Sequence, residues 1–256
     1  MTARSLGFAT DLALRAAEGS EVRRSGGVTV VRTPGNPAFR WGNFILVPEA
    51  GDPEARVRQH AAAFPGAGFV TIGVDDARAE VDDGAWRAAG FEVERLVVLT
   101  AERALQQPAA RALVRPLESD EDWAAQTAIA FELEPDGDDA HLEFTRRVTV
   151  VKRAAVQRGA MLWFGVEDGG RIVATAGVGD AGDGVARFQD VQTREPFRRR
   201  GYAGALVAAG AAAAARAFGS SRSVLVAEPD GPAIGLYRRL GFRDAEAQVQ
   251  LSRVDR

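Results

Sequence analysis

Residues 193–203 read Thr-Arg-Glu-Pro-Phe-Arg-Arg-Arg-Gly-Tyr-Ala, and they join an apolar strand-like run to an alanine-rich helical run. A tight turn at a helix N-terminus directs unpaired backbone N–H groups toward one point, where the helix dipole adds positive potential. Gly201 lets the backbone approach a ligand closely, and Arg198, Arg199 and Arg200 add positive charge. The stretch therefore predicts a turn that binds phosphate.

A second motif follows this turn: a strand at 223–227, then Leu236-Tyr237-Arg238-Arg239-Leu240-Gly241-Phe242. The first half of the chain contains a similar order, a strand at 69–74 and then Trp86-Arg87-Ala88-Ala89-Gly90-Phe91. Both motifs are short helices that end at Gly-Phe before a long apolar strand. We interpret the pair as a degenerate internal duplication.

Hydrophobic periodicity and turn residues predict an α/β chain with a mixed sheet and two domains, 1–105 and 111–256. The segment Gln106–Ala110, which contains Pro108, is the predicted linker. The predicted helices are 6–17, 53–64, 83–89, 120–131, 141–158, 201–218 and 233–240. The predicted strands are 28–31, 43–47, 69–74, 91–100, 113–117, 161–167, 171–178, 185–193, 223–227 and 242–251.

The two motifs of the second half, in this order and spacing, resemble the GNAT superfamily of N-acetyltransferases. The signature of that family is Arg/Gln-x-x-Gly-x-Gly/Ala opening a helix, followed by Leu-Tyr-x-x-Leu-Gly-Phe. The resemblance covers about Leu113 to Val254 and, more faintly, the first half. It implies two GNAT-like domains in tandem, with a mixed, mostly antiparallel sheet. It also implies that the central strands of the C-terminal domain splay apart.

The resemblance further implies acetyl-CoA, or another acyl-CoA, as co-substrate of an N-acyltransferase, and a role for each matching residue. The backbone of the strand around Val191, Gln192 and Thr193 would pair with the pantetheine amides. The pyrophosphate would lie on Arg198, Arg199, Arg200, Gly201, Tyr202 and Ala203. Tyr237 matches the general acid that protonates the leaving thiolate.

The general base is less clear, because Arg187 and Gln189 stand where relatives often carry Glu or His. Strand alternation predicts one face that carries Arg187, Gln189, Val191 and Thr193, and an opposite face that carries Asp190 and Gln192. Asp190 and Glu228 are the candidate bases, and a water relay is the alternative.

The first half lacks the features of a cofactor site. Glu49 and Asp52 would repel a pyrophosphate, and Pro48 and Pro53 lack the N–H donors that it needs. Trp86 stands where the second half has its tyrosine. We therefore expect this half to bind no CoA.

Composition excludes several other classes of protein. The 256 residues carry a net charge of −3 and no cysteine, which rules out disulfides, thiolate metal sites and a cysteine nucleophile. Acyl transfer would then be direct, from thioester to amine. His60 and His141 are too few for a histidine-rich site, so no metal is expected. With no signal-peptide pattern and no long apolar run, the expected location is the cytoplasm, without membrane contact.

Two other functions remain open from the sequence. One is a non-catalytic module that binds acyl-CoA; the other is nucleic-acid binding through Arg194 and Arg198–Arg200, which the net acidic charge disfavours. The expected acceptor is a primary amine on a small molecule or peptide. The acidic run 132–139 would attract a cationic amine, although charge runs are usually solvated. A monomer is expected, since a tandem arrangement can replace a homodimer.

Overall fold

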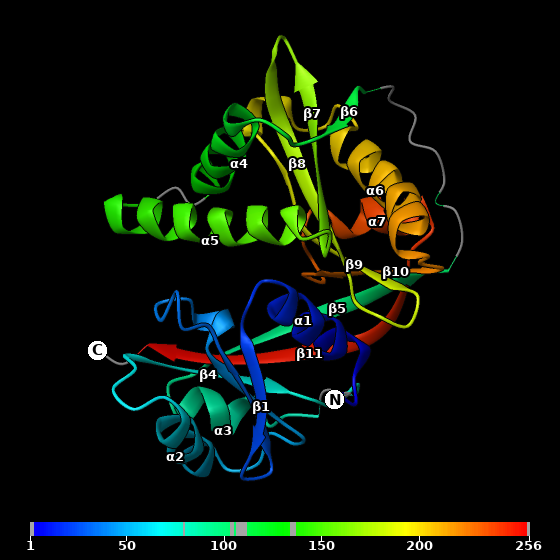
Figure 1. Ribbon diagram of the computed structural model, residues 1–256. Coiled ribbons are helices and arrows are strands. Elements are labelled where there is room, and N and C mark those ends of the chain that lie inside the picture. Colours follow the sequence, from blue (N-terminus) through cyan, green and yellow to red (C-terminus); the bar gives the residue numbers. More distant parts are fainter. Residues whose placement is uncertain (1–2, 79, 103–104, 106–111, 134–136, 255–256) are drawn as a thin grey trace. The chain divides into compact units, whose positions relative to one another are not determined.

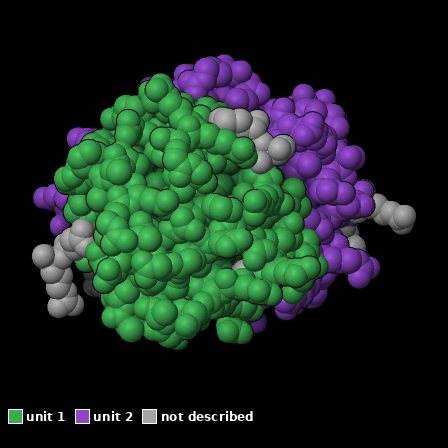
Figure 2. Space-filling view, turned by 90° about the horizontal axis from the view of Figure 1, so that it is seen from below, with its two compact units in different colours: residues 1–98, 226–231, 244–256 green, residues 99–225, 232–243 purple. Residues whose placement is uncertain are grey.

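The computed structural model describes residues 3–78, 80–102, 105, 112–133 and 137–254, so the predicted linker at 106–110 lies outside the described residues. The chain forms two compact units, shown in green and purple in Figure 2. Unit 1 comprises residues 1–98, 226–231 and 244–256, and unit 2 comprises residues 99–225 and 232–243. These units interleave along the sequence, so the two consecutive domains 1–105 and 111–256 stay a prediction.

Every helix and strand predicted from periodicity is present, with ends that differ by a few residues (Figure 1). The helices are α1 (Leu6–Ala17), α2 (Pro53–Ala63), α3 (Asp83–Ala88), α4 (Asp120–Glu132), α5 (Asp139–Gln157), α6 (Tyr202–Phe218) and α7 (Ile234–Leu240). The strands are β1 (Glu21–Ser25), β2 (Val28–Arg32), β3 (Phe44–Val47), β4 (Phe69–Val74), β5 (Glu92–Ala101), β6 (Val114–Pro116), β7 (Met161–Asp168), β8 (Arg171–Asp180), β9 (Val185–Thr193), β10 (Arg222–Ala227) and β11 (Arg243–Val254). The sequence patterns missed β1 and two 3₁₀ turns, η1 (Arg40–Gly42) and η2 (Glu195–Phe197).

Unit 1 is a sheet covered on both faces, with strand order β1-β2-β3-β4-β11-β5, and most of β5 belongs to this unit. Strands β3 and β4 run parallel, while the β1–β2, β2–β3 and β4–β11 pairs are antiparallel. Ile45 and Val47 of β3 point into a core that includes Trp86 of α3. Phe44 and Leu46 pack on the opposite face, against Phe8 of α1. Because both faces are covered, all four residues of β3 are buried.

Helices α3 and α7, which the predicted duplication relates to each other, end in the same local geometry. In both, a glycine with positive φ ends the helix, Gly90 at +82° and Gly241 at +106°. The next residue donates its N–H to the carbonyl of the aromatic residue: Phe91 to Trp86 at 3.0 Å, and Phe242 to Tyr237 at 3.1 Å. The two aromatic rings of each motif then meet edge to face. The same C-terminal cap therefore occurs in both halves.

Unit 2 has the strand order β10-β9-β8-β7-β6, in which β9 and β10 are parallel and the other pairs antiparallel. Helices α4 and α5 lie on one face of this sheet and α6 on the other (Figure 1). Trp163 of β7 contacts Trp123 of α4, with ring centroids 5.9 Å apart. On the α6 side, Gly210 lies so close to Phe188 of β9 that a Cβ there would sit 2.8 Å from the ring. The sheet is thus mixed and mostly antiparallel, as predicted.

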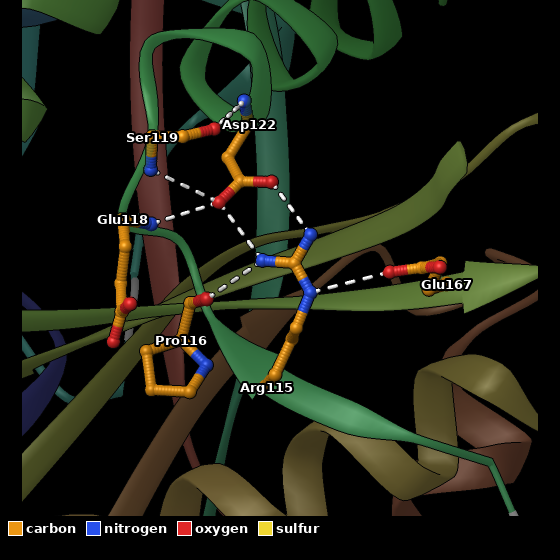
Figure 3. A network of polar contacts seen from close by, with 6 residues as sticks. All are labelled: Arg115, Pro116, Glu118, Ser119, Asp122 and Glu167. Atoms are coloured by element: carbon orange, nitrogen blue, oxygen red, sulfur yellow. Dashed lines mark hydrogen bonds and ion pairs between the residues drawn. The ribbon is translucent and has the colours of Figure 1, made fainter. Parts of the chain in front are cut away.

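A partly buried ion pair fastens β6 to the start of α4 (Figure 3). Arg115 donates to both carboxylate oxygens of Asp122, at 2.7 and 2.8 Å, and its Nε donates to Glu167 at 3.3 Å. Asp122 also accepts the backbone N–H groups of Glu118 and Ser119, and the Ser119 hydroxyl accepts the N–H of Asp122. This is a capping box that an arginine from a neighbouring strand completes. The Arg115 contact holds the pKa of Asp122 well below its usual range.

Candidate functional site

Strands β9 and β10 separate after a short parallel pairing. The register runs from Arg222↔Val185 to Val224↔Arg187, and no further pairs join the described residues of the two strands. Strand β9 continues to Thr193 and β10 to Ala227. The splayed central strands expected of this half are therefore present, and they leave an edge of β9 without a strand partner.

A bulge in β9 lies at the start of this edge. Thr175 of β8 pairs with Gln192, whereas Gly177 pairs with Gln189, so β9 carries one extra residue between these pairs. Asp190, within the bulge, has a φ of +48°, which is uncommon for a residue with a side chain. Bulges bend a strand, increase its twist and are frequent next to active sites.

Because of the bulge, the side chains of β9 lie on different faces of the sheet from those that simple alternation predicts. Paired residues on neighbouring strands share a face, and Thr175 and Gly177 are two positions apart, so Gln189 and Gln192 lie on one face together. That face is covered by α4 and α5. Thr193 pairs with Ala174 and lies on the opposite face, together with Phe188. The prediction of a single face for Gln189 and Thr193 was wrong because the extra residue reverses the alternation.

The backbone of β9 presents Val191 and Thr193 to its open edge. Arg194 donates its N–H to the carbonyl of Val173 on β8, at 3.0 Å. Because backbone polar groups alternate between the two edges of a strand, Gln192 also points toward β8, whereas Val191 and Thr193 point away from it. The Arg198 guanidinium contacts the Thr193 carbonyl at 3.3 Å. The backbone direction of Val191 and Thr193 agrees with the role predicted for them, which stays a prediction.

The predicted phosphate turn is an uncapped helix N-terminus. Arg199 and Gly201 both have positive φ, +65° and +84°, and α6 begins at Tyr202 without a side-chain cap. The first helical hydrogen bond goes from Ala205 N–H to the Gly201 carbonyl. No described group accepts the backbone N–H groups of residues 199–204. Alternating positive and negative φ directs such N–H groups into one concavity, which suits an anion.

The four arginines around this turn are not equivalent. Arg200 forms an ion pair with Asp168 at 3.0 Å, and Asp168 also accepts the Tyr202 hydroxyl at 2.7 Å. The hydrogen bond to Asp168 raises the pKa of Tyr202. Arg194 is paired with Glu132, at the end of α4. Within the described part of the chain, the Arg199 guanidinium has no ion pair or hydrogen bond. This leaves Arg198 and Arg199 as the arginines of the turn without a carboxylate partner there.

Tyr237 lies on α7 and is 4% exposed. Its ring contacts Phe242, and its hydroxyl has no hydrogen bond to a described residue. Burial raises the pKa of Tyr237 to about 12. The phenol is therefore protonated at neutral pH, which is the state that a general acid needs.

The structure separates the two candidate bases between the units. Asp190 of unit 2 forms an ion pair with Lys152 of α5. Glu228 belongs to unit 1 and is exposed. It lies near Glu94 of β5, whose pKa is raised by partial burial and by the charges of Glu228 and Glu92. Glu94 is thus a titratable carboxylate that the sequence patterns did not indicate.

A profile of the Acetyltransferase (GNAT) family matches residues 121–242. This range contains the bulge, the open edge, the uncapped turn and Tyr237. Residues 121–242 are a GNAT acetyltransferase domain. The resemblance noted in the sequence is confirmed for this part of the chain.

Solved structures show the same fold for the whole chain. A GCN5-related N-acetyltransferase from Kribbella flavida has a TM-score of 0.65 at 18% identity, over 97% of this chain and 96% of that one. A tandem GNAT protein from the clavulanic acid biosynthesis pathway has a TM-score of 0.53 at 15% identity, over 98% and 96%. A functionally unknown conserved protein from Staphylococcus epidermidis has a TM-score of 0.70 at 12% identity, over 93% and 95%. No curated protein matches the sequence significantly.

The equivalent place in the N-terminal half is closed, in contrast to the GNAT domain. Strands β3 and β4 pair up to Val47↔Val74, and Asp75 then donates its N–H to the Val47 carbonyl at 2.7 Å. The next helix, α2, begins at Pro53 with the Asp52 carboxylate accepting the Ala55 N–H at 2.8 Å. This half therefore has neither an open strand edge nor an uncapped helix at this position.

Lys152 and Asp168 are two residues of the GNAT domain that the motifs did not indicate. Lys152 lies on the buried stripe of α5, seven residues after Thr145. Its position could have been noticed in the sequence, because it falls at the spacing of the core-facing residues of this helix. A buried lysine needs a partner, so this spacing would have indicated a polar contact. Asp168 ends β7 and carries no comparable pattern.

Among the residues that the structure describes, no helix is long and apolar enough to cross a membrane. In the same ranges, no group of three or more His, Asp or Glu side chains is placed to hold a metal ion.

Proposed function

We propose that this protein is an N-acyltransferase that moves an acetyl or other short acyl group from acyl-CoA to a primary amine on a small molecule or peptide. The observation that carries the proposal is the uncapped turn of residues 198–204 at the end of the open edge of β9. Within the described residues, the N–H groups of residues 199–204 have no acceptor and β9 has no strand partner on its β10 side beyond Arg187, and both features lie in the range 121–242 that matches the GNAT acetyltransferase family.

The pantetheine arm fits the open edge of β9. Its amides would hydrogen-bond to the backbone of Val191 and Thr193, as an added strand does at a sheet edge. The face correction does not alter this role, because it depends on backbone direction and not on side chains. Gln192 lies between them with its backbone engaged toward β8.

The pyrophosphate fits the N–H groups of residues 199–204 at the start of α6. The helix dipole and the nearby Arg198 and Arg199 guanidinium groups add favourable charge. Arg200 and Tyr202 act indirectly in this proposal, because Asp168 holds both side chains. Their backbone N–H groups remain part of the turn, together with those of Gly201 and Ala203.

In the proposed reaction the amine nitrogen attacks the thioester carbonyl carbon, a C–N bond forms and the C–S bond breaks. Tyr237 would donate its proton to the departing thiolate. The amine must lose a proton to a carboxylate or, through water, to solvent. The candidates for this step stay Glu228, a water relay and Asp190, which carries an ion pair with Lys152. The chain has no cysteine, so transfer is direct.

Calorimetric titration with acetyl-CoA tests the proposal, with wild type beside Gly201→Glu. The new side chain would place bulk and negative charge at the pyrophosphate, so we expect at least a 100-fold loss of affinity, about 2.7 kcal/mol. Gly219→Glu is the matched control, since Gly219 has positive φ, +66°, at the opposite end of α6 with no neighbour near its Cβ position. Equal affinity for wild type and Gly201→Glu would refute the site.

Turnover distinguishes an enzyme from a binding module. Release of free CoA thiol is measured with a panel of primary amines, each with and without the protein. Acetyl-CoA binding without thiol release on any amine would favour the non-catalytic alternative. Two acetyl-CoA sites per chain would contradict the closed N-terminal half.

A further inference from the structure

We infer that Lys152 and Asp190 form a clamp that holds the bulge of β9, and that this clamp keeps the Val191 N–H directed at the open strand edge. Lys152 is then a positioning residue for the bound acyl-CoA. The inference rests on the proposed function, because it assigns the clamp's purpose to cofactor binding.

The bulge needs such support because of its backbone conformation. Asp190 has a φ of +48°, a left-handed conformation that brings the Cβ of a residue close to the following carbonyl oxygen. Aspartate tolerates this conformation better than most residues, but tolerance alone does not select it over a regular strand. A side-chain contact that exists only in the bulged form would do so.

Lys152 supplies that contact. It is the only lysine of the chain, it is 8% exposed, and its ammonium group forms an ion pair with the Asp190 carboxylate. The ammonium also lies over the Trp163 ring, 5.3 Å from its centroid. A buried ammonium is costly without a partner, so its position is set by these two contacts. Lys152 thus joins α5, β7 and the bulge of β9.

Loss of the bulge would shift one part of β9 by one residue. Phe188, before the bulge, is 1% exposed and packs tightly against Gly210 of α6, so this part is fixed. The part after the bulge would have to slip instead. A one-residue slip reverses the direction of every backbone N–H and C=O group in the part that slips, so the Val191 N–H would turn toward β8. The clamp therefore determines which backbone groups the open edge offers.

The Val191 N–H is the first donor of the open edge beyond the bulge. A fixed N–H at this place can donate a hydrogen bond to the thioester carbonyl oxygen, where negative charge develops during attack by the amine. This role differs from that of a general base. A base acts through its own carboxylate, whereas the clamp acts through the backbone and needs Lys152 as much as Asp190.

Three variants and one control test the clamp. Lys152→Met keeps the aliphatic stem and removes the charge, and Asp190→Asn removes the opposite charge. In Lys152→Met/Asp190→Gly no charge is left unpaired, and glycine takes positive φ without support. Arg153→Met is the control, since Arg153 is the next residue on α5 and pairs with the exposed Asp120.

The first measurement is amide hydrogen exchange of a peptide covering residues 188–194 in the protein without ligand. We expect faster exchange in Lys152→Met and Asp190→Asn than in wild type and Arg153→Met. The second is calorimetric affinity for acetyl-CoA, with kcat and KM where turnover is found. We expect both single variants to weaken binding about tenfold, and Lys152→Met/Asp190→Gly to bind within about threefold of wild type.

Each alternative gives a different result. If Asp190 is a base, Asp190→Asn loses kcat with acetyl-CoA affinity intact, Lys152→Met does not imitate it, and the clamp is wrong. Unchanged exchange and affinity in Lys152→Met would also overturn it. If Lys152→Met fails to fold, a double variant that folds but binds as weakly as Asp190→Asn overturns the clamp in the same way. Wild type that does not bind acetyl-CoA would refute the proposed function itself, whatever the exchange data show.

Discussion

Replacing Arg115 by Met should destabilise unit 2 through the carboxylate that it leaves behind. The methionine keeps most of the aliphatic stem but removes the guanidinium that joins β6 to α4 (Figure 3). Asp122 is only 6% exposed at its side chain, so it would keep the backbone N–H groups of Glu118 and Ser119 as its remaining partners. The variant therefore tests whether this ion pair stabilises the fold.

The size of the effect follows from the exposure of the two partners. Hydrogen bonds to charged groups contribute about 1.5–3 kcal/mol each when they are shielded from water. The Arg115 side chain is 36% exposed, which lowers this contribution. We expect a loss of about 2 kcal/mol in the free energy of unfolding at pH 7. For a chain of this size, that corresponds to a fall in Tm of about 4–8 °C.

The pH dependence gives a second and sharper test. The pKa of Asp122 is lowered in the folded state, so its contribution is fully present above the unfolded pKa of about 4 and is lost as pH falls below it. At pH 3, about one unit below the unfolded pKa, protonation of this group would cost the wild type about 1 kcal/mol of stability. The stability of Arg115→Met falls less as the pH is lowered, because Asp122 has already lost its arginine partner. The difference in free energy of unfolding between wild type and variant should therefore be about half as large at pH 3 as at pH 7.

Urea unfolding at pH 7 and pH 3, followed by circular dichroism, measures these differences. Arg147→Met is the matched control, because Arg147 pairs with Glu143 one turn away on the exposed face of α5, at 3.0 Å. Such a pair contributes about 0.3–0.5 kcal/mol. The reasoning is refuted if Arg115→Met is no less stable than Arg147→Met at pH 7. It is equally refuted if the difference in free energy of unfolding between wild type and Arg115→Met is as large at pH 3 as at pH 7, or larger.

Three other predictions concern single residues. Tyr237→Phe should lower kcat at least tenfold, while the affinity for acetyl-CoA changes less than twofold. Because the pKa of Tyr237 is about 12, its titration should cause no fall in kcat up to pH 10. An equal loss of kcat and acetyl-CoA affinity in Tyr237→Phe would make Tyr237 a packing residue. Arg199→Ala should weaken acetyl-CoA binding more than Arg200→Ala, because Asp168 already neutralises Arg200; the reverse order in calorimetry would contradict the assignment. Asp75→Ala should lower Tm by several degrees, since its carboxylate accepts the N–H groups of Arg4 and Ser5 ahead of α1; an unchanged Tm would show that α1 is held by its apolar face alone.

Local sequence signals predicted the features that depend on local chemistry. Gly201 and the arginines before an alanine-rich run predicted a turn at a helix N-terminus, and the structure has an uncapped helix start there, while phosphate binding at this turn stays a prediction. Gly-Phe after a short helix predicted a shared local structure in the two halves, and both helices end in the same cap, while the duplication itself stays a prediction. These features are set within about six residues, so a sequence pattern contains them almost completely.

Features that depend on distant partners were not predictable in the same way. The bulge at Asp190 is defined by the register against β8, and alternation within β9 alone gave the wrong faces. Its partner Lys152 is 38 residues away in sequence. Strand β1 was missed because its residues are mostly polar and exposed, and its pairing with β2 across the turn at Gly26 forms it. In each case a second segment decides the structure.

The contrast between the two halves bears on which of them binds the cofactor. In the N-terminal half the Val47 carbonyl is paired, and the start of α2 is capped by Asp52. Among the described residues of the GNAT domain, β9 has no strand partner on its β10 side beyond Arg187 and the start of α6 has no side-chain cap, and a missing helix cap alone costs about 1 kcal/mol. Backbone polar groups are otherwise nearly always satisfied in folded proteins. The N-terminal half shows that this kind of fold can pair its strand edge and cap the helix that follows. The open strand edge and uncapped helix of the GNAT domain are therefore explained if a ligand completes their hydrogen bonds. An extended arm that carries amides and ends in phosphates has the matching shape and charge.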